Sequence, residues 1–94
     1  MKLTNQVVFD KVKKELKKLP DHILRKLQKW AEQVEMLGLW EIKKIPGYHD
    51  EPLAGDRKGQ RSIRLSKSYR AIYMEERDGS IELILIIEVN KHKY

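Results

Sequence analysis

The sequence predicts an α+β fold, and three observations predict it. Two amphipathic helical patterns occupy the first forty residues. A basic stretch with the alternation of a β-hairpin follows, because Ile63 and Leu65 alternate with polar residues. Near the end, Ile81 to Val89 is apolar on both faces, as in a central strand. At 94 residues, we expect one domain covering residues 1–94.

The first element has two possible interpretations. Residues 3–9 form a short strand ending in Val7, Val8 and Phe9, or they open the first helix. From Asp10 onward, apolar residues recur at helical spacing up to Leu19. The other face of this helix is predicted to be exposed to solvent, because it carries Lys11, Lys13, Lys14, Lys17 and Lys18.

A second helix should follow Pro20, with Asp21 as its N-cap and Gly38 at its end. Its short connection to the first helix predicts an antiparallel helical hairpin. Trp30 falls on the apolar stripe, so we expect it in the core rather than in contact with a base. The stripe consists of Ile23, Leu27, Trp30, Val34 and Leu37.

Residues 39–45 are apolar in pattern and could form either a helical turn or an irregular cover strand. Tyr48, His49 and Asp50 form a polar loop. Farther along, residues 75–79 predict an acidic turn before the last strand. In that strand, alternation groups one set of residues on one face and a second set on the other: Leu83, Leu85, Ile87 and Val89, opposite Ile84, Ile86 and Glu88.

The stretch from Glu51 to Tyr73 has the most functional character. It holds six basic residues against two acidic ones, on a turn followed by a hairpin. Within such a hairpin, Arg64 and Arg70 can lie near each other across the strands. Like charges repel, so this arrangement indicates a surface that faces an anion.

Composition excludes several classes of site and protein. With no cysteine, the chain has no disulfide, thiolate zinc site or cysteine nucleophile. No histidine and acid cluster has the spacing of metal ligands, so we expect neither metal nor cofactor. There is no leader-like start and no apolar segment of membrane length, so we expect a cytoplasmic protein without membrane contact. The net charge of +6 favours a polyanionic partner.

The motifs PLAGDRKGQRSIRL, YRAIY and KHKY, in this order after two short helices, resemble the RelE/ParE toxin superfamily and, more closely, its mRNA-cleaving RelE and HigB side. The resemblance covers nearly the whole chain. It implies a RelE-like fold: an N-terminal helical hairpin packed on one face of a curved, mostly antiparallel sheet of about four strands. It also implies a type II toxin that cuts mRNA inside a translating ribosome.

The resemblance assigns roles to particular residues. Glu51 matches the position before Pro-Leu where relatives carry a glutamate or histidine for proton transfer. Arg70 matches the arginine on the scissile phosphate, and Arg64 a basic strand residue of the same groove. His92 matches a C-terminal histidine, and Tyr94 a terminal aromatic residue that can stack on a base.

Metal-free RNA cleavage requires a base, a positive phosphate site and an acid. Glu51 could act as base and His92 as acid, or they could exchange these roles, with Arg64 and Arg70 as phosphate clamp. His49 is a reserve candidate for proton transfer. Without the resemblance, Glu51 would be interpreted as the ion-pair partner of a neighbouring arginine, and the terminal residues as surface residues.

Five further residues are expected to bind RNA rather than react with it: Arg57, Lys58, Arg61, Lys91 and Tyr94. Alternation puts Arg61 on the side of Ile63, at the edge of the core or at its rim. The resemblance also implies partners: a cognate antitoxin, mRNA in the ribosomal A site, the ribosome, and promoter DNA only through the antitoxin complex. The alternatives are a ParE-like DNA gyrase inhibitor without nuclease activity and an inactive antitoxin-binding relative.

Overall fold

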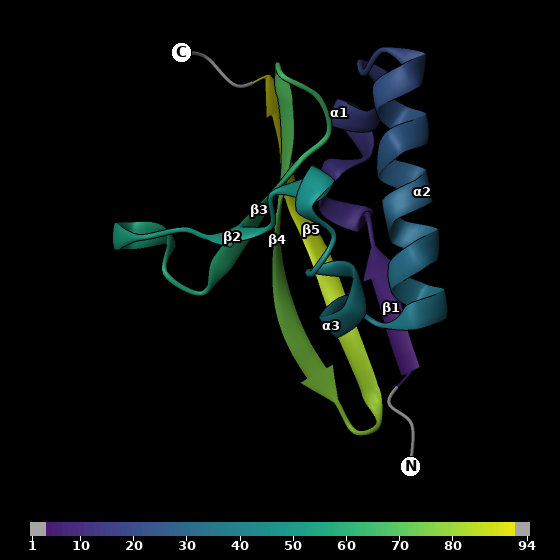
Figure 1. The fold of residues 1–94 in the computed structure, drawn as a ribbon, viewed down its shortest axis with the longest axis vertical. Coiled ribbons are helices and arrows are strands. Elements are labelled where there is room, and N and C mark those ends of the chain that lie inside the picture. Colours follow the sequence, from purple (N-terminus) through teal and green to yellow (C-terminus); the bar gives the residue numbers. More distant parts are fainter. Residues whose placement is uncertain (1–3, 92–94) are drawn as a thin grey trace.

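A single mixed sheet organises the chain (Figure 1), and the computed structural model describes residues 4–91 of it. The strand order is β1-β5-β4-β3-β2, with β1 parallel to β5 and the other neighbours antiparallel. The strands are β1 (Thr4–Val8), β2 (Glu51–Pro52), β3 (Gln60–Arg64), β4 (Tyr69–Asp78) and β5 (Ile81–Lys91). Of the two interpretations of the first element, the strand is the one that the structure shows, at Thr4–Val8. The sheet has one strand more than the predicted four. The additional strand is β2, which was not predicted because two residues are too few to show alternation.

The helices pack on one face of the sheet, with α2 running along it in Figure 1. They are α1 (Lys13–Lys17), α2 (Asp21–Leu37) and α3 (Leu39–Ile42), with single 3-10 turns η1 (Asp10–Val12), η2 (Pro46–Tyr48) and η3 (Gly55–Arg57). None of the helices between residues 4 and 91 is long and apolar enough to cross a membrane.

Three details of the helices differ from the sequence prediction or complete it. The first helix is shorter than predicted, because its start is a 3-10 turn and its α-helical part ends at Lys17. Pro20, not Asp21, is the N-cap residue of α2, and no side chain caps this end. Residues 39–42 resolve the open alternative in favour of a helical turn. Gly38 ends α2 as predicted, at φ 89°.

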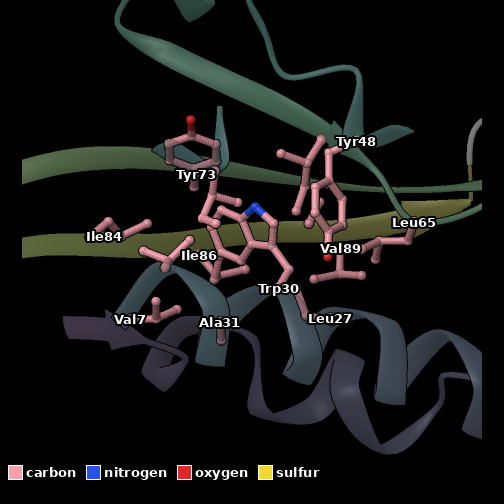
Figure 2. Close-up of a cluster of buried hydrophobic side chains, with 14 of the residues drawn as sticks. Val7, Leu27, Trp30, Ala31, Tyr48, Leu65, Tyr73, Ile84, Ile86 and Val89 are labelled. Atoms are coloured by element: carbon pink, nitrogen blue, oxygen red, sulfur yellow. The ribbon is translucent and has the colours of Figure 1, made fainter. Parts of the chain in front are cut away.

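The core lies between α2 and the sheet (Figure 2). Trp30 is fully buried, as predicted, and its ring centroid lies 5.4 Å from that of Tyr73. Ile84 and Ile86 of β5 are buried with them. Leu37 was predicted in the buried stripe but is 58% exposed, because α2 ends there and the chain turns at Gly38.

A β-bulge in β5 changes which residues share a face. The register shifts between Ile72 and Tyr73 of β4, which pair with Glu88 and Ile86, so Ile87 is the extra residue. Val89 consequently joins Ile86 on the helix side, and the predicted grouping of Val89 with Leu83, Leu85 and Ile87 was wrong. Glu88 and Asn90 move to the opposite face, the face of Arg70.

Two hairpins connect β3, β4 and β5. The predicted β3–β4 hairpin is confirmed, and Ser66 Oγ stabilises its turn by accepting hydrogen bonds from the backbone N–H groups of Ser68 and Tyr69. The predicted acidic turn at residues 75–79 was wrong for most of its length, because β4 continues to Asp78. Only Gly79 and Ser80 form the turn, with Gly79 at φ 61°.

Candidate functional site

Two arginines lie side by side on the sheet face opposite the helices. Arg64 at the end of β3 pairs in register with Arg70 near the start of β4, as the sequence predicted. Arg64 is exposed and Arg70 half-buried. Arg70 Nε donates a long hydrogen bond of 3.4 Å to Asn90 Oδ1 on β5. Because adjacent like charges repel, this pair forms a ready site for an anion.

A cleft of about 220 Å³ opens beside this pair. It is smaller than the roughly 300–1,000 Å³ of typical small-molecule sites, so it suits a phosphate and its immediate neighbours more than a whole cofactor. Its polar lining is mostly cationic or able to transfer protons: His49, Glu51, Arg64, Lys67, Tyr69 and Arg70. The cleft thus brings together the three predicted catalytic residues that fall within residues 4–91, together with the reserve candidate His49.

Glu51 is positioned by the short strand β2, where it pairs with Ser62 of β3. Its side chain is exposed at the cleft. None of the ion pairs within residues 4–91 involves Glu51, so it is not the salt-bridge partner of a neighbouring arginine. Its carboxylate therefore borders the cleft without a fixed cation partner among residues 4–91.

The preceding residue, Asp50, has a buried side chain, only 1% exposed, that anchors this segment to the sheet. Its carboxylate accepts a hydrogen bond of 2.6 Å from Arg61 Nε and one of 2.5 Å from the Tyr73 hydroxyl. Burial lowers the pKa of Arg61, but the hydrogen bond and charge of Asp50 outweigh it and raise the pKa overall. Burial, then the hydrogen bond to Asp50, raises the pKa of Tyr73 strongly. Arg61 therefore lies away from Arg64, engaged with the core side.

His49 sits between two anchored residues. Tyr48 is 4% exposed and its hydroxyl donates a 2.6 Å hydrogen bond to Gln33 Oε1 of α2. Asp50 is fixed as described above. His49 itself is exposed and adopts the left-handed conformation, with φ 44° and ψ 48°. This conformation is uncommon for residues other than glycine, although asparagine, aspartate and histidine tolerate it best.

The other predicted RNA-binding residues are dispersed. Arg57 is half-exposed but engaged, because its Nη2 donates to Glu88 Oε2 at 2.5 Å and its Nε to Gln60. Lys58 is exposed beside it, and Lys91 ends β5 opposite Tyr69. His92 and Tyr94 lie outside the described residues.

Sequence reasoning missed the anchor formed by Asp50, Arg61 and Tyr73. The only sequence signal for this anchor was the alternation that put Arg61 on the core side. A basic residue in that position requires an acidic partner. For metal binding, residues 4–91 contain no cluster of three or more histidine and acidic side chains.

No protein-family model matches the sequence, and no curated protein matches it either. Solved structures do match over nearly the whole chain. The toxin–antitoxin complex RelBE2 from Mycobacterium tuberculosis gives a TM-score of 0.63 at 19% identity, covering 98% of this chain and 100% of that one. The YoeB/ParE toxin from Agrobacterium tumefaciens gives 0.64 at 18% identity, covering 97% and 100%.

YafQ from Escherichia coli strain BL21(DE3) gives a TM-score of 0.63 at 18% identity, covering 97% of this chain and 94% of that one. At such identities the likeness concerns the fold. The mostly antiparallel sheet, the helices on one face and the match over nearly the full length agree with the expectation from the sequence motifs. The chain has a RelE-like fold.

Proposed function

We propose that this chain is the toxin of a toxin–antitoxin pair and that it cuts mRNA bound in the ribosomal A site. One observation carries the proposal: Arg64 and Arg70 converge on a cleft that also exposes Glu51, whose carboxylate forms no ion pair with residues 4–91. This is the combination of positive charge and proton acceptor that phosphate transfer requires. The likeness in fold to the RelBE2, YoeB/ParE and YafQ proteins supports it.

In the proposed reaction, Glu51 takes the proton of the 2′-hydroxyl, and the 2′-oxygen attacks the adjacent phosphorus. Arg64 and Arg70 bind the phosphate oxygens as negative charge develops, each able to bind two of them through its planar guanidinium. The bond from phosphorus to the 5′-oxygen breaks. The products are a 2′,3′-cyclic phosphate and a 5′-hydroxyl end, and no water is consumed.

The proposed partners are an antitoxin, the ribosome and mRNA, with promoter DNA bound only through the antitoxin complex. The net charge of +6 supports attraction to ribosomal RNA and to an acidic protein segment. The antitoxin is further supported by the RelBE2 neighbour, which was solved as a toxin–antitoxin complex.

The test is to induce the protein in bacteria and map new 5′ ends on cellular mRNA. We expect ends at a fixed position within codons, abolished by Arg70→Ala and by Glu51→Gln. Arg77→Ala is the matched control, because Arg77 is an exposed arginine at the far end of the same strand. Growth arrest with DNA damage signalling but no new ends would instead identify a gyrase inhibitor, and no arrest would identify an inactive relative.

A further inference from the structure

The proposed reaction still lacks the group that protonates the leaving oxygen, and the cleft supplies one. We propose that His49 is the general acid, donating its proton to the 5′-oxygen as the bond to phosphorus breaks. This inference rests on the proposed function of the same cleft. It assigns acid and base to two residues separated by one position, His49 and Glu51.

His49 lies two residues before β2 and lines the cleft with Arg64 and Arg70. Glu51 of β2 pairs with Ser62 of β3, in antiparallel orientation. Continuing that register by two residues brings position 49 opposite Arg64, which itself lies opposite Arg70. The strand stops short of this, but His49 still lines the cleft together with both arginines. Proton donor, phosphate site and proton acceptor therefore border one opening.

The backbone around His49 is held rather than free. Tyr48 is bonded to α2 through Gln33, and Asp50 is bonded to β3 and β4 through Arg61 and Tyr73. These anchors on either side keep His49 in its left-handed conformation while its side chain remains exposed at the cleft. A strained conformation fixed by its surroundings, at a cleft, is a frequent feature of functional sites.

The groups around the cleft place His49 among residues that can bind a phosphate and transfer protons. The titratable and charged groups that border the cleft with His49 are Glu51 on β2, Arg64 on β3, Lys67 in the turn, and Tyr69 and Arg70 on β4. Histidine is the side chain that most often transfers protons in enzymes, so a histidine beside two arginines and a carboxylate suits acid catalysis.

The proton balance closes between the two residues. Glu51 gains the proton of the 2′-hydroxyl, and His49 loses one to the 5′-oxygen. The bond between the 2′-oxygen and phosphorus forms as the bond between phosphorus and the 5′-oxygen breaks. Exchange with solvent then returns both residues to their starting forms.

The experiment measures the rate of cleavage of two mRNAs bound to ribosomes. One has an ordinary phosphodiester at the cleavage site in the A site, and in the other sulfur replaces the 5′-bridging oxygen of that phosphodiester. A thiolate leaves without being protonated, so the sulfur substrate does not need an acid. The variant is His49→Asn, because asparagine tolerates the left-handed conformation but cannot donate a proton in this way. We expect at least a 100-fold loss on the oxygen substrate and less than about a 10-fold loss on the sulfur substrate.

Several outcomes decide the inference. Equal losses on both substrates, or no loss, would overturn it and leave His49 a turn residue. Rescue by sulfur in His92→Asn but not in His49→Asn would assign the acid to His92 instead. The alkaline decline of the wild-type rate should disappear with the sulfur substrate, and its persistence would also count against His49. If the wild-type protein cuts neither substrate, the proposed function fails, which is distinct from failure of the His49 assignment alone.

Discussion

Arg64 and Arg70 lie directly opposite each other on adjacent antiparallel strands, and neither forms an ion pair with any residue between 4 and 91. Two uncompensated cations at a paired position oppose folding. We expect a bound phosphate to relieve this repulsion, so that the interaction that destabilises the free protein would add to its affinity for an anion.

Replacing one member of this pair should make the free protein more stable. We expect Arg64→Gln to raise the free energy of unfolding by roughly 0.2–1 kcal/mol. The same change should abolish most of the rise in melting temperature that inorganic phosphate causes in the wild type. Arg77→Gln provides the control, and an undiminished phosphate effect in Arg64→Gln would contradict the phosphate site.

The anchor formed by Asp50, Arg61 and Tyr73 predicts a large loss of stability when one carboxylate oxygen of Asp50 is replaced by an amide nitrogen. In Asp50→Asn, Arg61 loses its charged partner while its side chain stays 27% exposed. We expect the free energy of unfolding to fall by about 2–3 kcal/mol, less than for a fully buried pair, because water can partly solvate Arg61. Urea unfolding measures this. Glu51→Gln, one residue away and exposed, should change stability by less than about 0.5 kcal/mol.

Removing the hydroxyl of Tyr73 tests the second hydrogen bond to the Asp50 carboxylate. Tyr73→Phe keeps the ring against Trp30 and removes only the hydrogen bond to Asp50. We expect a loss of about 1–2 kcal/mol in urea unfolding, with no change in the secondary structure seen by circular dichroism. A neutral effect would mean that Arg61 alone satisfies the carboxylate.

Periodicity was sufficient to predict the parts of the fold that repeat. The stripe of α2 predicted Trp30 in the core, and the hairpin pattern predicted Arg64 near Arg70 across the strands. The first depends only on spacing within one helix, and the second on a short turn between two adjacent strands. The candidate site was predicted from these placements together with the resemblance of the motifs.

Features that depend on a single irregular residue were not predictable. The bulge at Ile87 reverses the faces of Glu88, Val89 and Asn90, and no residue type marks it. Nor does the sequence show which of the adjacent acids Asp50 and Glu51 is buried. Only tertiary contact with Arg61 and Tyr73 decides that Asp50 is the anchor and Glu51 the exposed group.

The left-handed backbone at His49 predicts that two substitutions there change stability in different directions. His49→Gly relieves about 1 kcal/mol of conformational strain, partly offset by the greater entropy of the unfolded chain, so stability should stay level or rise slightly. His49→Val should lose about 1–2 kcal/mol, because a β-branched residue fits this conformation poorly. Thermal unfolding separates the two. Equal stability of both variants would show that the loop relaxes out of this conformation.

The glutamate pair between β4 and β5 predicts a dependence of stability on pH. The side chain of Glu82 is only 20% exposed. Burial raises its pKa, as do the hydrogen bond and charge of Glu75, while Arg77 and Lys43 act in the opposite sense. An acid with a raised pKa binds its proton more tightly in the folded state, so its contribution is fully present below the unfolded pKa and is lost as pH rises through the folded pKa.

Glu82→Gln should therefore be more stable than the wild type at pH 7, and this difference should disappear at about pH 4, where the wild-type carboxyl is protonated. Urea unfolding at a series of pH values measures the difference. Glu76→Gln removes one charge from an exposed position of β4 and controls for the change in net charge. If both variants show the same pH profile, net charge rather than the burial of Glu82 next to Glu75 governs the effect.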